Sequence, residues 1–172
     1  MNYRRRFFTI SGACALMTAF PALTQQTPFR VGWIAPGTMT EGLPLLDALR
    51  QGLRDLGYSE DRNFVIDARW GDHSGTRTET LAAELVAGEP NVIVALGPDT
   101  YAIRRATTSL RVVFGFSGDP VQAGFARSLS RPGGNLTGIS FLALELVGKR
   151  IEFLRAVMPG AQRIAIVANS QH

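Results

Sequence analysis

The sequence predicts an α/β fold, a doubly wound parallel sheet of Rossmann-like type with helices on both faces. Short apolar, strand-like segments alternate with amphipathic helical segments, and short joints rich in Gly, Pro and Asp separate them. In such an alternation each helix is a right-handed crossover that returns the chain to the next parallel strand. The chain has 172 residues, 45% hydrophobic and 19% charged, which is the composition of a globular protein.

The first predicted elements begin at residue 29. Residues 29–35 (FRVGWIA) form a short apolar strand, and leucines at helical spacing predict a helix after it that ends at Gly57. These leucines are Leu45, Leu49, Leu53 and Leu56. Residues 63–70 alternate apolar and polar side chains, which predicts a strand with one buried face, and residues 79–87 form the second helix.

The middle of the chain continues the alternation. Residues 91–97 (NVIVALG) are an almost continuous apolar run, as expected for a central parallel strand covered on both faces. A short helix over 100–108 and a strand over 112–116 follow. Apolar residues that recur every four positions over 121–129 predict another helix, and residues 135–141 form the fifth strand.

The last 30 residues suggest an incomplete second unit. Residues 143–158 predict a helix, and residues 163–169 (RIAIVAN) predict a sixth strand. The apolar stripe of that helix consists of Leu144, Val147, Ile151, Leu154 and Met158. A parallel strand normally needs a covering helix after it, so we expect the chain to be truncated early in a second unit.

The amino terminus predicts export. MNYRRR is a basic n-region, and FFTISGACALMTAF is an apolar h-region too short to span a bilayer, so residues 1–26 are interpreted as a signal peptide that is cleaved between Ala22 and Gln26. The run YRRRFFT also fits the twin-arginine pattern, and both export routes stay open. The predicted localisation is periplasmic.

Charge and cysteine content exclude several functions. Three of the 18 basic residues lie at 4–6, so residues 27–172 carry 15 basic against 14 acidic residues, which argues against nucleic-acid binding. The single cysteine, Cys14, lies within the signal, where Ser11 makes a lipoprotein motif unfavourable. A mature chain without thiols has no disulfide, no thiolate metal site and no cysteine nucleophile.

The joints after the strands hold the candidate chemistry, because ligands of open α/β sheets bind beyond the carboxyl ends of the strands. Three loops lie there: PGTMTEG after the first strand, PDT after the third and SGDP after the fourth. In the last loop, Pro120 suits the first position of a helix and Asp119 its N-cap. The same carboxylate would face the crevice and could bind the ammonium group of a ligand, or act as an acid or base.

Other site motifs are absent from the sequence. It has no P-loop, no G-x-G-x-x-G fingerprint and no G-x-S-x-G elbow. His73 stands beside Asp72, and such a pair is more typical of a solvated loop than of a metal site, which needs three or four ligands. We therefore expect neither a metal nor a cofactor.

Five segments together resemble the substrate-binding protein family of bacterial ABC transporters, which includes tryptophan and tyrosine binders. They are FRVGWIAPG, LRQGLRDLGYSEDRNFVIDARWGD, LAAELVAGEPNVIVALG, FSGDPVQAGFARSLSRPGGNLTGIS and LVGKRIEFLRAVMPGAQRIAIVAN. Their order and spacing are similar over residues 29–169, and GDPV followed by RPGGNLTG is the most specific part.

The resemblance implies a type I periplasmic binding protein, in which a small solute is bound between two α/β lobes that close on it. Residues 27–141 would form the first lobe and 142–172 the start of the second. The implied ligand-binding residues are Pro36, Gly37, Thr38, Asp99, Thr100, Ser117 and Asp119. Many relatives have a small Gly-Thr pair where this chain has Gly97-Pro98-Asp99, so the ligand stays open.

The implied function is capture of an amino acid or related compound and its delivery to an ABC transporter permease in the inner membrane, without catalysis. Two alternatives stay open. One is an enzyme on a flavodoxin-like sheet that uses Asp119, although Asp99 is the only second titratable group predicted near it. The other is a small-molecule-sensing module that serves a partner outside transport.

Overall fold

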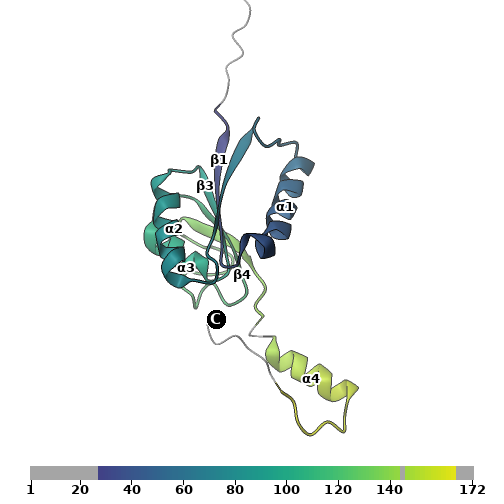
Figure 1. Cartoon of the computed structure of the whole chain (residues 1–172). Helices are drawn as coiled ribbons and strands as arrows, with labels where there is room; N and C mark the ends of the chain where they lie inside the picture. Colours follow the sequence, from purple (N-terminus) through teal and green to yellow (C-terminus); the bar gives the residue numbers. More distant parts are fainter. Residues whose placement is uncertain (1–26, 144–145, 166–172) are drawn as a thin grey trace, which may run out of the picture.

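The computed structural model describes residues 27–143 and 146–165, and Figure 1 shows their arrangement. The predicted signal segment with Cys14, the stripe residue Leu144 and the last part of the predicted sixth strand, residues 166–169, lie outside the described residues. Strands and helices alternate along the described chain up to β4, as the sequence predicts.

One parallel sheet of five strands forms the centre of the fold. Its strands are β1 (Phe29–Ala35), β2 (Phe64–Trp70), β3 (Val92–Leu96), β4 (Val112–Phe116) and β5 (Leu136–Ser140). The spatial order is β2-β1-β3-β4-β5, and every neighbouring pair is parallel. This order confirms the predicted doubly wound sheet and places its topological switch point between β1 and β3.

Helices cover both faces of the sheet (Figure 1). They are α1 (Met39–Asp55), α2 (Gly75–Ala87) and α3 (Asp99–Ala106), and α4 (Val147–Val157) follows β5. α1 lies on one face, where Leu46 packs with Trp33 and Ala35 of β1. α2 and α3 lie on the opposite face. The chain changes face after β2, as a doubly wound sheet requires.

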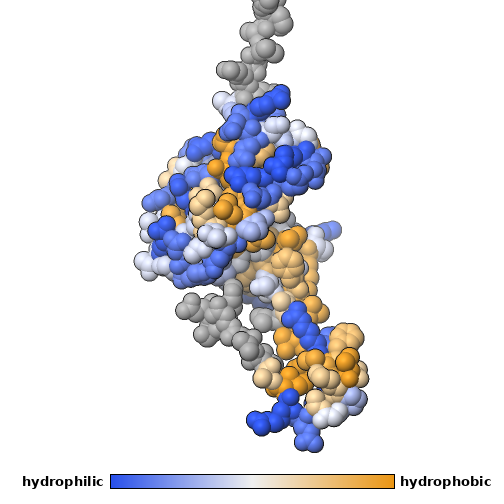
Figure 2. All heavy atoms as spheres, turned by 45° about the vertical axis from the view of Figure 1, so that its right-hand side comes forward, coloured by the Kyte–Doolittle hydropathy of each residue, from blue (hydrophilic) through white to orange (hydrophobic). Residues whose placement is uncertain are grey.

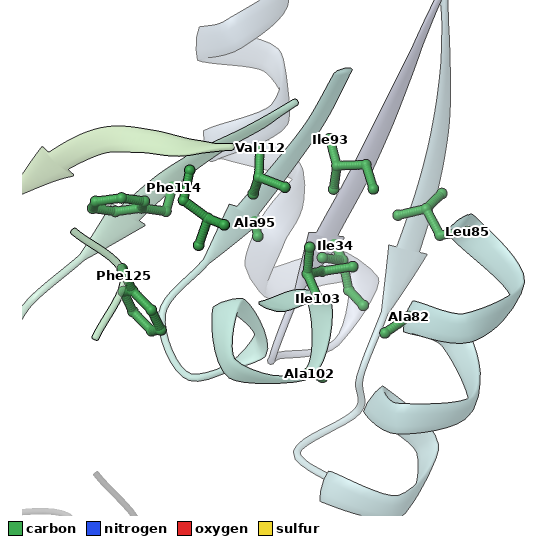
Figure 3. Packing of buried hydrophobic residues seen from close by; sticks show 11 residues of the cluster. Ile34, Ala82, Leu85, Ile93, Ala95, Ala102, Ile103, Val112, Phe114 and Phe125 are labelled. Atoms are coloured by element: carbon green, nitrogen blue, oxygen red, sulfur yellow. The ribbon is translucent and has the colours of Figure 1, made fainter. Parts of the chain in front are cut away.

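The larger core lies between the sheet and the pair α2 and α3 (Figure 3). Ile34 and Ile93 come from the two central strands, and Leu85 and Ile103 come from the two helices. All four are at most 1% exposed. Burying a side chain of this size is worth about 1.5–3 kcal/mol, so this layer contributes much of the stability of the fold.

The buried face of α1 differs from the predicted stripe. Leu45 and Leu56 are 56% and 75% exposed, whereas Gly42 and Leu46 are buried. The reason is tertiary packing: the Trp70 ring lies directly on Gly42, where an added Cβ would come within 2.1 Å of Cζ3. With this contact, the side of α1 that carries Gly42 and Leu46 faces the sheet. The leucine spacing alone did not indicate this orientation.

The helix predicted over 121–129 is wrong, because the chain forms only one turn there. Asp119 begins this turn, and the N–H of Phe125 donates to Pro120 O at 2.8 Å while that of Gly124 donates to Val121 O at 3.0 Å. These two bonds form a Schellman motif, with Gly124 in the left-handed conformation at a φ of 72°. The motif ends the helix after its first turn. Phe125 is then free to enter the core.

α4 is shorter than the predicted helix and has no buried residue. The exposed fractions of Phe153, Leu154 and Val157 are 69%, 40% and 79%. Apolar surface therefore gathers on α4 and on the segment that leads to it (Figure 2). Residues 161–165 have no regular structure, so the described part of the predicted sixth strand is not a strand.

Candidate functional site

The candidate site lies at the carboxyl ends of β1, β3 and β4, which are neighbours in the sheet. The chain leaves β1 toward one side of the sheet and β3 toward the other, so the two loops that follow them diverge at the switch point, where ligands of open α/β sheets bind. Residues 36–38 form the first loop, and residues 97–98 lead directly into α3. Residues 117–119 follow β4 beside them. The predicted site residues therefore lie on the loops after β1 and β4 and at the start of α3.

Thr38 is the N-cap of α1 and forms a capping box with Glu41. The Thr38 N–H and Oγ1 donate to Glu41 Oε2 at 2.7 Å and 2.9 Å. The backbone bond from Thr38, followed by the bond from its hydroxyl, holds the pKa of Glu41 below its usual value. Two further N–H groups at this helix start, those of Met39 and Thr40, have no intrahelical acceptor and are suited to an anionic group.

A fourth loop, residues 71–74 between β2 and α2, belongs to the site and was not predicted. Its N–H groups donate to the loop after β1: Asp72 to Gly37 O at 3.2 Å and His73 to Pro36 O at 2.7 Å. His73 Nε2 also lies 2.9 Å from Glu41 Oε2. The positive φ values of Asp72 and His73, 50° and 59°, allow this close packing. No sequence motif marked these contacts, because they join residues about 35 positions apart.

Asp99 is a buried carboxylate at the start of α3, only 4% exposed. Oδ1 accepts a bond from Thr78 Oγ1 at 3.3 Å, and Oδ2 has no hydrogen-bond partner among the described residues. Burial raises the pKa of Asp99 to about 6, although the Thr78 bond opposes the shift. A buried, half-satisfied carboxylate in this position is costly, and such groups are common in functional sites.

The Asp99 side chain contributes to a pocket of about 320 Å³ between the N-terminal parts of α2 and α3. Pro36 and His73 line it from the loops, and Thr78 and Arg105 line it from the helices. Gly71 keeps the loops close together, because a Cβ there would lie 3.2 Å from Pro36 O and 3.4 Å from Asp99 Oδ2. The structure thus brings Pro36 and Asp99 into one small space.

Thr100 lies beside this pocket but is fully buried. Its Oγ1 donates to Ala95 O at 3.4 Å, a contact that ties α3 to β3. In this arrangement the hydroxyl supports the loop and has no surface for a ligand. The sequence placed Thr100 just after the carboxyl end of β3. The direction of its side chain depends on how α3 is rotated about its axis, which the sequence did not show.

Asp119 has the local role that its Gly-Asp-Pro setting predicts. Oδ1 accepts the N–H groups of Val121 at 2.7 Å and Gln122 at 3.4 Å, which confirms the capping interaction. The side chain stays half-buried, so part of the carboxylate faces solvent. Ser117 is exposed, and its carbonyl accepts the N–H of Ala143 at 2.7 Å. The loop after β4 is thereby joined to the segment after β5.

Two further observations concern ions and membranes. Among residues 27–143 and 146–165, no cluster of three or more His, Cys, Asp or Glu side chains is arranged to hold a metal ion. Within the same residues, no helix has the length and apolar character needed to cross a membrane.

A relative of established name is similar to most of this chain. The chain is 30% identical over 133 residues to a tyrosine-binding protein of Clostridioides difficile, a match that covers 74% of this chain and 38% of that protein. The chain thus spans well under half the length of that relative.

Solved structures show the same fold. A conserved domain protein of Vibrio cholerae aligns with a TM-score of 0.67 and 28% identity, over 78% of this chain and 45% of that one. An ABC domain in complex with L-Trp from Streptococcus pneumoniae aligns with a TM-score of 0.61 and 25% identity, over 66% of this chain and 39% of that one.

The family is shown by a third comparison. The family model described as ABC transporter substrate binding protein matches residues 43–172, which is most of the chain and includes the loops after β2, β3 and β4. The description of the family and the name of the Clostridioides difficile relative both denote binding proteins. The chain belongs to the ABC transporter substrate-binding protein family.

Proposed function

We propose that this chain provides one lobe of an extracytoplasmic receptor that binds a free amino acid for an ABC importer. The observation that carries the proposal is the set of polar groups at the carboxyl ends of the three neighbouring strands β1, β3 and β4. The carboxylates of Asp99 and Asp119 follow β3 and β4, and the N-terminal end of α1 follows the neighbouring β1. An amino acid carries an ammonium and a carboxylate group, which these two kinds of group complement.

The contacts of each residue follow from its position. The ligand carboxylate binds the N–H groups of Gly37, Met39 and Thr40 at the start of α1, where the helix dipole also favours an anion. The ammonium group binds the free part of the Asp119 carboxylate or enters the pocket beside Asp99. Pro36, Thr38 and Ser117 line the crevice, and Thr100 supports it from below.

We expect the ligand to be an aromatic amino acid, because two relatives are described with such a ligand. One is described as a tyrosine-binding protein, and the other was solved with L-Trp. In the whole receptor a second lobe covers the side chain and closes over the crevice. The permease of an inner-membrane ABC transporter is the partner. Residues 1–26 direct export and are then removed by cleavage between Ala22 and Gln26.

The enzyme and sensor alternatives have less support. Asp119 Oδ1 is occupied by two backbone N–H groups, which suits a fixed carboxylate better than a group that exchanges protons. A sensing module would use the same crevice, so the ligand experiment applies to it equally. Only a direct assay with the permease separates transport from sensing.

The test is amide mapping by NMR, which detects weak binding to one lobe. We expect L-tyrosine or L-tryptophan to shift the amides of residues 36–40, 97–101 and 117–122. N-acetyl-L-tyrosine, which lacks the ammonium group, should cause no such shift. Absence of shifts with every amino acid tried, or shifts confined to other parts of the chain, would contradict the proposal.

Two variants sharpen the test. Asp119→Asn removes the charge that faces the ligand and should weaken binding by about tenfold, since hydrogen bonds to charged groups are the strong ones. Asp47→Asn on α1 is the matched control, because its carboxylate is exposed and, among the described residues, pairs only with Arg50. Equal affinities of the two variants would mean that Asp119 has no role in binding.

A further inference from the structure

A second hollow, which we call the basic groove, lies on the other side of α3 from the pocket at Asp99, and the two hollows share Arg105 in their linings. It is bounded by the C-terminal end of α3 and by residues 124–136, and its volume is about 580 Å³. The lining includes Arg104, Arg105 and Arg127 and contains no acidic side chain. Tyr101 and Thr108 add hydroxyl groups to it. Nearly all its charged and polar side chains are hydrogen-bond donors.

Two of the arginines are held in place by glycines with left-handed backbones. A Cβ at Gly124 would lie 3.1 Å from Arg104 Nη1 and Nη2, and one at Gly133 would lie 2.8 Å from Arg127 Cδ. Both glycines have a φ of 72°. Arg104 Nη1 also donates to Ala123 O at 3.4 Å. The two arginine side chains therefore pack against glycine backbone. Because this packing limits their conformations before binding, they lose less conformational entropy when a ligand binds.

The charge of the groove is not neutralised within the described part of the chain. Arg105 pairs with Glu79, but none of the described carboxylates lies within 4.0 Å of a side-chain nitrogen of Arg104 or Arg127. Residues 100–143 contain five arginines and a single acid, Asp119, which follows the carboxyl end of β4 and does not line the groove. Such uncompensated charge in a hollow attracts anions.

We propose that the basic groove is a binding site for a phosphate group, separate from the amino-acid site. Planar guanidinium groups donate paired N–H bonds that match phosphate oxygens, and the groove offers two such groups without an ionic partner in the described residues. The phosphate belongs either to a small molecule or to the headgroup of an anionic lipid. This inference does not depend on the proposed function, because Arg104 and Arg127 line the groove and not the pocket beside Asp99, with which the groove shares only Arg105.

The first experiment measures the binding of inorganic phosphate to the full chain by NMR titration, with chloride at matched ionic strength as the reference. We expect phosphate to shift the amides of residues 124–136, and the double variant Arg104→Gln, Arg127→Gln to bind it at least tenfold more weakly. Arg62→Gln is the control, because Arg62 is exposed and lies outside the groove. Equal effects of phosphate and chloride, or equal affinity of the double variant, would overturn the proposal.

The second experiment identifies the source of the phosphate. The chain is sedimented with vesicles of phosphatidylcholine, with and without phosphatidylglycerol. Binding that needs phosphatidylglycerol and disappears in the double variant assigns the groove to a lipid headgroup. Phosphate binding without vesicle binding assigns it to a small phosphorylated molecule. Vesicle binding that persists in the double variant, with no effect of phosphate, would show that the groove is not the site.

Discussion

α3 and α4 are both short amphipathic helices, but their surroundings differ completely. α3 has eight residues, and four of them are buried, including Ile103 with no exposed surface. α4 has eleven residues and none is buried. Helices of this length are marginal in water without packing. The comparison shows that apolar spacing predicts a helical conformation, whereas a neighbouring surface decides whether the helix stabilises the fold.

The largest effect is expected where α3 meets the sheet. Ile103→Ala removes a fully buried side chain between the helix and the strands and leaves a cavity. We expect it to lower the free energy of unfolding by about 3 kcal/mol. Urea denaturation followed by circular dichroism measures this loss. A loss below about 1 kcal/mol would show that α3 is loosely packed and resembles α4.

A smaller effect of opposite sign is expected at the first residue of α3. Asp99→Asn replaces a buried carboxylate by a neutral amide that costs less to bury and can still accept the Thr78 bond. We expect the variant to be more stable at pH 7 by about 1–2 kcal/mol. Its binding of an amino acid should weaken at the same time. Lower stability would mean that the charge at Asp99 is compensated in the folded chain.

The same carboxylate gives the wild-type chain a pH dependence. The folded-state pKa of Asp99 is about 6 and its ordinary value is 3.8, so the folded state binds the proton more tightly. The stabilisation that this bound proton gives the folded state is fully present below pH 3.8 and is lost as the pH rises through 6. Thermal unfolding between pH 4 and 7 should show this decline in the wild type, and Asp99→Asn should lack it.

The cap at Asp119 should have an effect of intermediate size. Asp119→Ala removes the acceptor of the Val121 and Gln122 N–H groups and should cost about 1 kcal/mol of stability. Asp119→Ser keeps a capping oxygen and should restore most of this loss without restoring the charge. Denaturation of both variants, set beside their ligand affinities, separates the structural role from the binding role. Equal stability of Asp119→Ala and the wild type would contradict the cap.

The sequence predicted the five strands and the first three helices because each has a buried face that leaves a periodic pattern. It also predicted the cap at Asp119, which is a local interaction between neighbouring residues. It did not predict that Gly124 would end the next helix after one turn, because the apolar spacing over 121–129 continues past that glycine. Nor did it predict the contacts of His73 and Thr78, which lie far along the chain from their partners.

The smallest effect is expected on α4. Leu154→Ala changes a side chain that is 40% exposed, and Ala favours a helix as well as Leu does, so the free energy of unfolding should change by less than about 0.5 kcal/mol. Hydrogen exchange gives an independent measure. The amides of α4 should exchange far faster than those of α3, because fraying of an unpacked helix requires no global unfolding. A loss near that of Ile103→Ala, together with slow exchange in α4, would show that α4 is packed in solution against a surface that it does not contact here. Slow exchange that appears only at high protein concentration would place that surface on a second copy of the chain.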